Sequence, residues 1–260
     1  AWPSPGSPMA WSARQRAMLD EMGVRLWLPP ETKFQRAPVD TPQPIAQQVQ
    51  AVVPVTPSPR GDRPTGVAAM DWPALREAVT NCSACKLCQG RRQTVFGVGH
   101  PHAHWMVVGE APGEQEDRQG EPFVGKSGQL LDNMLRAIGL TRAQAEPAQQ
   151  VYIANTIKCR PPGNRNPEPE ELAQCEPFLI RQVELVKPKI ILAMGRFAVQ
   201  SLLRSNEPIG RLRGRVHRYQ GVPLIVTYHP AYLLRNLEDK ARAWDDLCLA
   251  QQTLKAVDAP

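Results

Sequence analysis

From Met70 to the end of the chain, apolar runs of strand length alternate with longer segments of helical pattern. We expect strands at 104–108, 151–154 and 190–194, and a hairpin or paired edge from 216–219 and 224–226. The other segments predict helices at 71–79, 127–138, 167–186, 196–203 and 239–255. Strands that alternate with helices pair in parallel and are covered on both faces. The sequence therefore predicts an α/β domain with a mostly parallel central sheet of about four strands.

The N-terminal quarter has a different composition. About a dozen of the 27 prolines fall within residues 1–66, and the stretch 37–65 shows little periodicity. Such a segment buries too little apolar surface to offset its ordering entropy. We expect 1–66 to be a mostly disordered arm and 67–260 to be the folded domain. A short helix at 12–22 is the expected exception, either as a transient helix or as a docking motif for a partner protein.

Charge and hydropathy narrow the class of protein. The formal net charge is +6, and five arginines lie between positions 204 and 218. Such a cluster is either a solvated basic face or a surface that contacts phosphates. No apolar run approaches the ~18 residues that a membrane span needs, and the N-terminus lacks the pattern of a signal peptide. We expect a cytoplasmic monomer.

Four of the six cysteines have the spacing of ligands. Cys82 and Cys85 form a C-x2-C hook, and fifteen residues separate Cys159 from Cys175. Thiolates from a hook and two distant segments can surround one metal ion or one [4Fe–4S] cluster. The spacing alone leaves zinc and iron–sulfur open.

The remaining two cysteines have other interpretations. Cys88 continues the spacing of the hook and could replace Cys85 as a ligand, whereas Cys248 lies in a predicted helix and is expected to be a buried core thiol. Six cysteines are few for a disulfide-stabilised secreted protein of 260 residues. A reducing compartment and a bound metal or cluster are favoured instead.

Three segments follow predicted strands, where ligands bind in sheets of this type. The first begins at Gly109 and continues through 110–117 and 120–128 with several glycines and carboxylates. It predicts either an acidic surface loop or a turn that brings backbone amides close to a ligand. Phe123 in this segment either belongs to the core or stacks on a planar base.

The second segment begins at Asn155. An Asn side chain offers one donor and one acceptor, which match the O4 and N3–H edge of uracil and mismatch the amino group of cytosine. Asn is also a common turn residue, so this segment alone does not decide between the two interpretations. Arg160 and Arg165 follow in a stretch rich in Pro and Gly and are suited to phosphate contacts.

The third segment contains His229 on a tight turn. A His there can donate a hydrogen bond to an oxygen that gains charge, although a lone His is more often structural. Leu233 and Leu234, followed by Arg235, could wedge into a base stack and hold a phosphate. Helix packing is the alternative for the two leucines.

Taken in order, these motifs resemble family 4 uracil-DNA glycosylases over the stretch 82–235. The residues that carry the resemblance are Cys82-x2-Cys85, Gly109-Glu-Ala-Pro-Gly113, Pro122-Phe-Val-Gly125, Asn155-x3-Cys159-Arg-Pro-Pro162, Cys175 and Tyr228-His-Pro230. The resemblance implies an α/β/α sandwich and a DNA repair enzyme that flips uracil out, hydrolyses its glycosidic bond and leaves an abasic site. It also implies a [4Fe–4S] cluster on Cys82, Cys85, Cys159 and Cys175.

The resemblance also implies roles for the residues of the three segments. Phe123 stacks on the uracil ring, Asn155 reads its edge, and His229 stabilises negative charge on O2. Gly109 and Ala111 lie against the base, and Glu110 and Glu116 position water or exclude the methyl group of thymine. The expected DNA contacts are Arg160, Arg165, Arg213, Arg215, Leu233, Leu234 and Arg235.

One position departs from the pattern of the best-known uracil glycosylases. There, an Asp directly before the motif Pro orients the attacking water, and here that position is Ala111. The group that activates water therefore stays open. The chemistry could depend more on stabilising the leaving group and the sugar cation than on a strong base.

Two other classes of protein share some of these features. One is a uracil-binding protein that traps its base covalently through a His in a basic loop, but the stretch 155–175 is short and contains no His. The other is a regulatory iron–sulfur module that binds DNA without catalysis. The second class predicts that changes at Asn155 and His229 leave activity unaffected.

Overall fold

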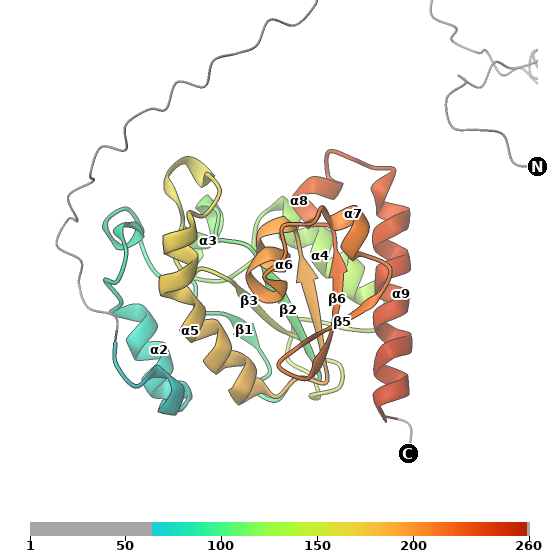
Figure 1. Cartoon of the computed structure of the whole chain (residues 1–260), viewed down its shortest axis with the longest axis horizontal. Coiled ribbons are helices and arrows are strands. Elements are labelled where there is room, and N and C mark those ends of the chain that lie inside the picture. Colours follow the sequence, from blue (N-terminus) through green and yellow to red (C-terminus); the bar gives the residue numbers. More distant parts are fainter. Residues whose placement is uncertain (1–63, 259–260) are drawn as a thin grey trace, which may run out of the picture. The chain divides into compact units, whose positions relative to one another are not determined.

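The computed structural model describes residues 64–258, which form a six-stranded sheet with helices on both faces (Figure 1). The strands are β1 (Val98–Gly99), β2 (Trp105–Gly109), β3 (Tyr152–Asn155), β4 (Ile190–Met194), β5 (Val216–Tyr219) and β6 (Val222–Thr227). Their order across the sheet is β1-β3-β2-β4-β6-β5. The predicted arm and its helix at 12–22 lie outside the described residues, apart from residues 64–66.

The four inner strands run parallel to one another, and β1 and β5 join as antiparallel edges. The prediction of an α/β domain with a mostly parallel sheet is therefore confirmed, and β5 with β6 forms the predicted paired edge. The sheet has six strands rather than about four because the paired edge contributes two strands, β5 and β6, and because β1 adds an edge strand that was not predicted. With only two residues, β1 is too short to produce a periodic pattern in the sequence.

The predicted helices are present, with ends that differ by up to three residues from the expected ones. They are α2 (Trp72–Thr80), α4 (Lys126–Ala137), α5 (Pro169–Val186), α6 (Arg196–Leu203) and α9 (Asp239–Asp258). Asp71 caps α2 as expected, since its Oδ1 accepts a hydrogen bond of 3.0 Å from the backbone N–H of Ala74. Short helices that the sequence did not predict are α3 (Glu114–Gln119), α7 (Ile209–Leu212) and α8 (Pro230–Leu233).

The two faces of the sheet bury alternate residues of each strand, as the period of two requires. On β2, Met106 and Val108 pack with α5 and α6, whereas Trp105 and Val107 face α4 and α9. The helix layers in Figure 1 follow from this alternation. No helix within residues 64–258 is long and apolar enough to span a membrane.

A third apolar cluster joins the N-terminal part of the domain to α5. It contains Leu75 and Val79 of α2, Phe178 of α5, and the two buried cysteines Cys159 and Cys175. Residues 64–97 are therefore packed against the sheet domain, and the cysteine hook lies beside the segment that follows β3.

Candidate active site

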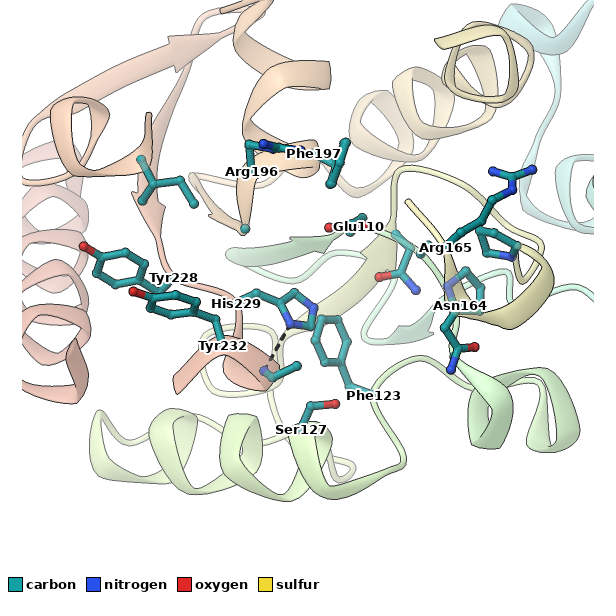
Figure 2. A pocket seen from close by; sticks show the side chains of 18 of the residues that line it. Glu110, Phe123, Ser127, Asn164, Arg165, Arg196, Phe197, Tyr228, His229 and Tyr232 are labelled. Carbon is teal, nitrogen blue, oxygen red and sulfur yellow. Dashed lines mark hydrogen bonds between the residues drawn. The ribbon is translucent and has the colours of Figure 1, made fainter. Parts of the chain in front are cut away.

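A pocket of about 800 Å³ lies at the carboxyl ends of the parallel strands, the position expected for a ligand site in such a sheet. Each inner strand delivers residues to it. Glu110 follows β2, Asn155 ends β3, Arg196 follows β4 by two positions, and His229 follows β6 by the same number. Figure 2 shows the side chains of Glu110, Phe123 and His229, which come from separate segments, around one space.

The ends of β2 and β3 are held in register by Thr156. Its backbone N–H donates to the carbonyl oxygen of Gly109 at 3.0 Å, and its hydroxyl donates to that of Glu110 at 2.6 Å. Asn155 and Glu110 are thereby fixed as neighbours on adjacent strands. The first two of the predicted site segments meet for this reason.

Asn155 carries a buried acceptor with no partner. Its side chain is 2 % exposed, and its Oδ1 has no hydrogen-bond partner among the described residues. A buried polar atom in this state costs free energy unless a ligand satisfies it. A Cβ on Gly109 would lie 2.5 Å from that Oδ1 and 2.5 Å from Cζ of Phe123. Only glycine at position 109 lets the amide and the aromatic ring occupy their places.

Phe123 has a positive φ of 54°, which is uncommon for a residue with a side chain. The loop packs so closely on α4 that a Cβ on Gly128 would lie 1.6 Å from the carbonyl oxygen of Phe123, so this approach requires glycine at position 128. The Phe123 ring stacks on the ring of His229, with centroids 5.3 Å apart and an interplanar angle of 27° (Figure 2). The predicted stacking residue and the predicted hydrogen-bond donor therefore share one wall of the pocket.

The hydrogen bonding of His229 determines which ring nitrogen carries the proton. Its Nδ1 accepts a hydrogen bond of 3.1 Å from the backbone N–H of Ala231 (Figure 2). In the neutral ring Nε2 must then be the donor. Burial lowers the pKa of His229 to about 4, with Glu116 opposing and Arg235 adding to the shift. His229 is thus a neutral donor near pH 7.

Glu116 lines the pocket, but the backbone occupies its carboxylate. One oxygen accepts from the N–H of Gly113 at 3.0 Å, and the other accepts from the N–H groups of Val124 at 3.0 Å and Gly125 at 3.2 Å. These contacts tie the start of α3 to the loop that carries Phe123. Glu116 is therefore suited to shaping the loop rather than to moving a proton.

Glu110 is the second carboxylate of the pocket. No hydrogen bond or ion pair to its carboxylate is found within the described part of the chain, although the positive charge of Arg196 acts on it. Burial raises the pKa of Glu110 to about 7, and Arg196 limits the increase. Ala111 also lines the pocket beside Glu110. Its side chain is a methyl group, which cannot orient water as an Asp at this position would.

The predicted DNA-contacting residues differ in their solvent exposure and in their contacts within the protein. Leu233 is 1 % exposed and packs in the domain, whereas Leu234 is 42 % exposed. Arg213 is ion-paired with the buried Asp246 at 2.9 Å. Leu233 and Arg213 therefore have structural contacts, and only Leu234 of the leucine pair presents a large apolar surface.

The other predicted arginines lie closer to solvent. Arg165 and Arg235 line the pocket, and Arg165 is held by Glu171 through an ion pair of 2.5 Å. Arg160 donates to Oδ1 of Asn164 at 2.7 Å. Arg215 is exposed and lies 4.0 Å from Glu207. Arg165 and Arg235 therefore lie at the pocket itself, whereas Arg160 and Arg215 do not line it.

The sequence interpretation missed the contribution of β4. The pocket is also lined by Gly195, Arg196 and Phe197, which directly follow β4. Their position after a predicted strand was the same signal that identified the other three segments. Tyr232 was also missed; it stacks on Tyr228 with centroids 5.1 Å apart. Both tyrosines lie at one side of the pocket in Figure 2.

The predicted cysteine ligands gather around a second, small cavity. It is lined by Cys82, Cys85, Cys88, Cys159 and Cys175, together with Arg91 and Lys158. Hydrogen-bond donors reach two of the sulfurs: Arg91 Nη1 donates to Cys159 Sγ at 3.1 Å, and the backbone N–H of Lys158 donates to Cys175 Sγ at 3.3 Å. Thiolates in such a place would be stabilised by these donors.

All six cysteines are free. Cys248 in α9 is half-buried rather than buried in the core as predicted, and it does not line the cavity. Burial raises the pKa of Cys159 to about 11 and that of Cys175 to about 12. No three ligating side chains in residues 64–258 are arranged to hold a single metal ion. Cys88 also lines the cavity, so it remains an alternative to Cys85.

Comparison with known proteins agrees with this geometry. Residues 96–248 match the model of the uracil DNA glycosylase superfamily. The type-4 uracil-DNA glycosylase of Sulfurisphaera tokodaii is 44 % identical over 171 residues, which cover 62 % of this chain and 75 % of that protein. The enzyme of the same name from Thermotoga maritima is 42 % identical over 170 residues, covering 65 % of this chain and 85 % of that protein.

The ends of the parallel strands thus bring the unpaired Oδ1 of Asn155, the ring of Phe123 and the neutral His229 to one pocket. The chain belongs to the uracil DNA glycosylase superfamily. The two relatives described above are named type-4 uracil-DNA glycosylases.

Proposed function

We propose that this protein is a DNA repair hydrolase that removes uracil from DNA after base flipping and leaves an abasic site. The observation that carries the proposal is the unsatisfied Oδ1 of Asn155 beside the ring of Phe123 and the neutral His229 in one pocket. A uracil ring supplies the N–H that Oδ1 lacks and a planar face for Phe123.

Base recognition follows from the Asn155 amide. Its Oδ1 accepts from uracil N3–H, and its Nδ2 donates to O4. Cytosine presents an unprotonated N3 and an amino group at those positions, so it would leave both groups of the amide unpaired. Sites that hydrogen-bond their ligand reject analogues without the partner atoms by large factors, because buried polar groups then stay unpaired.

Bond cleavage can proceed without a strong base. As the bond between N1 and C1′ breaks, its electron pair stays with the base and negative charge accumulates on O2. His229 donates a hydrogen bond from Nε2 to that oxygen. The negative Glu110 carboxylate stabilises the positive charge that develops at C1′. Water then adds to C1′, and the proton that it loses passes through solvent to the uracil anion, which leaves as neutral uracil. A preorganised donor of this kind contributes about 10²–10³ in rate.

Extrusion of the base costs a few kcal/mol. Leu234 is exposed beside the pocket-lining Arg235, and an apolar side chain inserted into the stack can offset part of that cost. Arg160, Arg165, Arg215 and Arg235 are the candidates for phosphate contacts. A pocket of about 800 Å³ is larger than one base needs and leaves room for the attached sugar and phosphate.

The same proposal includes a [4Fe–4S] cluster on Cys82, Cys85, Cys159 and Cys175. Three observations support this part of the proposal. The four cysteine sulfurs come from three segments, they line one cavity, and two of them accept hydrogen bonds. In a cluster each thiolate binds its own iron, so convergence on a single point is not required. When bound, the cluster would supply iron–sulfur bonds that cross-link these segments. Free thiols suit the reducing cytoplasm that we propose as the location.

The test is incubation with single- and double-stranded oligonucleotides that contain one uracil, followed by alkali. We expect strand cleavage at uracil and none at cytosine or thymine. His229→Ala and Asn155→Ala should each reduce the single-turnover rate by about 10²-fold or more and leave DNA affinity nearly unchanged. The matched control is His102→Ala, since His102 is exposed and does not line the pocket.

Three results would count against the proposal. Intact strands with the unmodified protein would refute glycosylase activity. Normal rates in the Asn155 and His229 variants would favour a binding module whose pocket is not catalytic. Uracil-DNA that stays attached to the protein through denaturing electrophoresis would indicate a covalent trap instead.

A further inference from the structure

Lys158 is a buried cation between the two sites described above. Its side chain is 1 % exposed, and it directly precedes Cys159. Its Nζ donates to the backbone carbonyl oxygen of Asn155 at 2.8 Å and to Oε1 of Gln182 at 2.6 Å. Its own backbone N–H donates to Cys175 Sγ at 3.3 Å. One residue thus contacts both the base-reading segment and the cysteine site.

Gln182 makes the position of Lys158 rigid. Its Nε2 donates to the carbonyl oxygen of Phe96 at 2.8 Å and to the hydroxyl of Tyr152 at 3.1 Å. Gln182 is fully buried in α5. Because the Oε1 of Gln182 is thereby oriented towards Lys158, the ammonium has two neutral acceptors at fixed places.

A cluster bound by the cysteines would balance the charge of Lys158. A buried ammonium is costly unless negative charge lies near it. No carboxylate among residues 64–258 forms an ion pair with Lys158 at the distances found for the other pairs, whereas the sulfurs of Cys159 and Cys175 act on it electrostatically. Four thiolates around a cluster would supply the compensating charge.

We propose that Lys158 is a positioning residue, which holds the peptide of Asn155 in place and links it to the four-cysteine site. This inference rests on the proposed function. Asn155 is the last residue of β3, so its amide is oriented by a backbone that leaves the sheet at that point. The hydrogen bond from Nζ to its carbonyl oxygen fixes this backbone, and Lys158 does so without lining the pocket.

The test uses Lys158→Met, which keeps most of the side-chain volume and removes the charged donor. The control is Lys240→Met, because Lys240 is exposed in α9 and lines neither cavity. For each protein we would measure iron and sulfide content, DNA affinity, inhibition by free uracil and the single-turnover rate. Displacement of a positioned group by about 1 Å can cost about 10²-fold. We expect Lys158→Met to lose about 10- to 100-fold in rate and to bind free uracil more weakly, with iron content retained.

A second comparison separates positioning from a purely structural role. If Lys158 acts through the side chain of Asn155, the Lys158→Met change should cost less than about threefold in an Asn155→Ala background. The same loss in both backgrounds, or a loss that follows the loss of iron, would overturn the inference. Should Lys158→Met fail to fold, Gln182→Met is the substitute variant, because it removes the Oε1 that accepts a hydrogen bond from Lys158. It should give a smaller rate loss, and this loss should also vanish in the Asn155→Ala background. The unmodified protein, assayed alongside, shows separately whether uracil is excised at all.

Discussion

At the scale of single residues, burial acts on the two titratable groups of the pocket in opposite directions. It raises the pKa of the Glu110 carboxyl to about 7 and lowers the pKa of the His229 imidazole to about 4. Both shifts have the same cause, because burial disfavours whichever form carries charge. His229 is therefore neutral across the physiological range, whereas the charge of Glu110 changes within it.

This difference predicts the pH dependence of the reaction. Below about pH 7 Glu110 is protonated and neutral, and above it the carboxylate can stabilise positive charge at C1′. We expect the single-turnover rate to rise with pH through about 7 and then to level off. Glu110→Gln should flatten the profile and lower its upper level by at least about 10-fold. Measuring the rate from pH 5.5 to 9 checks this.

The control for this profile is Glu121→Gln, since Glu121 is exposed and does not line the pocket. It should keep the wild-type profile. A pH dependence that survives in Glu110→Gln would assign the titration to another group and leave Glu110 without the role proposed for it.

At the scale of elements, the position of Phe123 between β2 and α4 depends on the hydrogen bonds of Glu116 and on the absence of a side chain at Gly128. Glu116 in α3 accepts three backbone N–H groups, and Gly128 in α4 leaves space for the carbonyl oxygen of Phe123. The sequence left open an acidic surface loop and a turn close to a ligand, and the resemblance implied that Glu110 and Glu116 position water or exclude the methyl group of thymine. In the structure the Glu116 carboxylate orders the loop around a residue with positive φ.

Gly128→Ala should therefore disrupt this element. Its Cβ would lie 1.6 Å from the carbonyl oxygen of Phe123, so the loop or the helix must move. We expect a loss of about 3 kcal/mol in the free energy of unfolding, at the upper end of the range for overpacking, and a clear loss of glycosylase rate. Urea denaturation and the uracil assay measure the two effects.

Gly90→Ala is the matched control, because nothing lies within 4 Å of a Cβ at Gly90 and its φ is −107°. It should change the free energy of unfolding by less than about 1 kcal/mol. Equal stability of the two variants would contradict the view that the close approach of Phe123 requires glycine.

At the scale of the whole molecule, the cysteines connect parts of the chain that are far apart in sequence. Cys82 and Cys85 follow α2, Cys159 follows β3, and Cys175 lies in α5. These are also the segments of the third apolar cluster. An iron–sulfur cluster bound by these cysteines would stabilise the packing of residues 64–97 against α5. It would also restrict the loop after Cys159, which reaches the pocket.

Cysteine variants test this arrangement. Cys159→Ser should lose iron and the brown absorbance, and it should lower the stability by a few kcal/mol, as expected for loss of a structural metal centre. Cys248→Ser should retain both iron and stability, because Cys248 does not line the cavity. Iron analysis and thermal unfolding provide the readout.

Cys85→Ser and Cys88→Ser then decide which of the two is the ligand. We expect the first variant to lose iron and the second to keep it. The opposite result would make Cys88 the fourth ligand, and full iron in every variant would refute the four-cysteine site.

The sequence by itself determined the α/β class, the five longer helices, the parallel core of the sheet, and the segments that hold Asn155 and His229, because strand and helix periods and residues after strands are local properties. Only the tertiary structure decided that Glu116 binds backbone, that Leu233 is buried while Leu234 is exposed, and that Arg196 joins the pocket. It also brought Lys158 between Asn155 and the cysteines. These outcomes depend on which distant segments meet, and a buried hydrogen bond or an exposed side chain exists only once they have met.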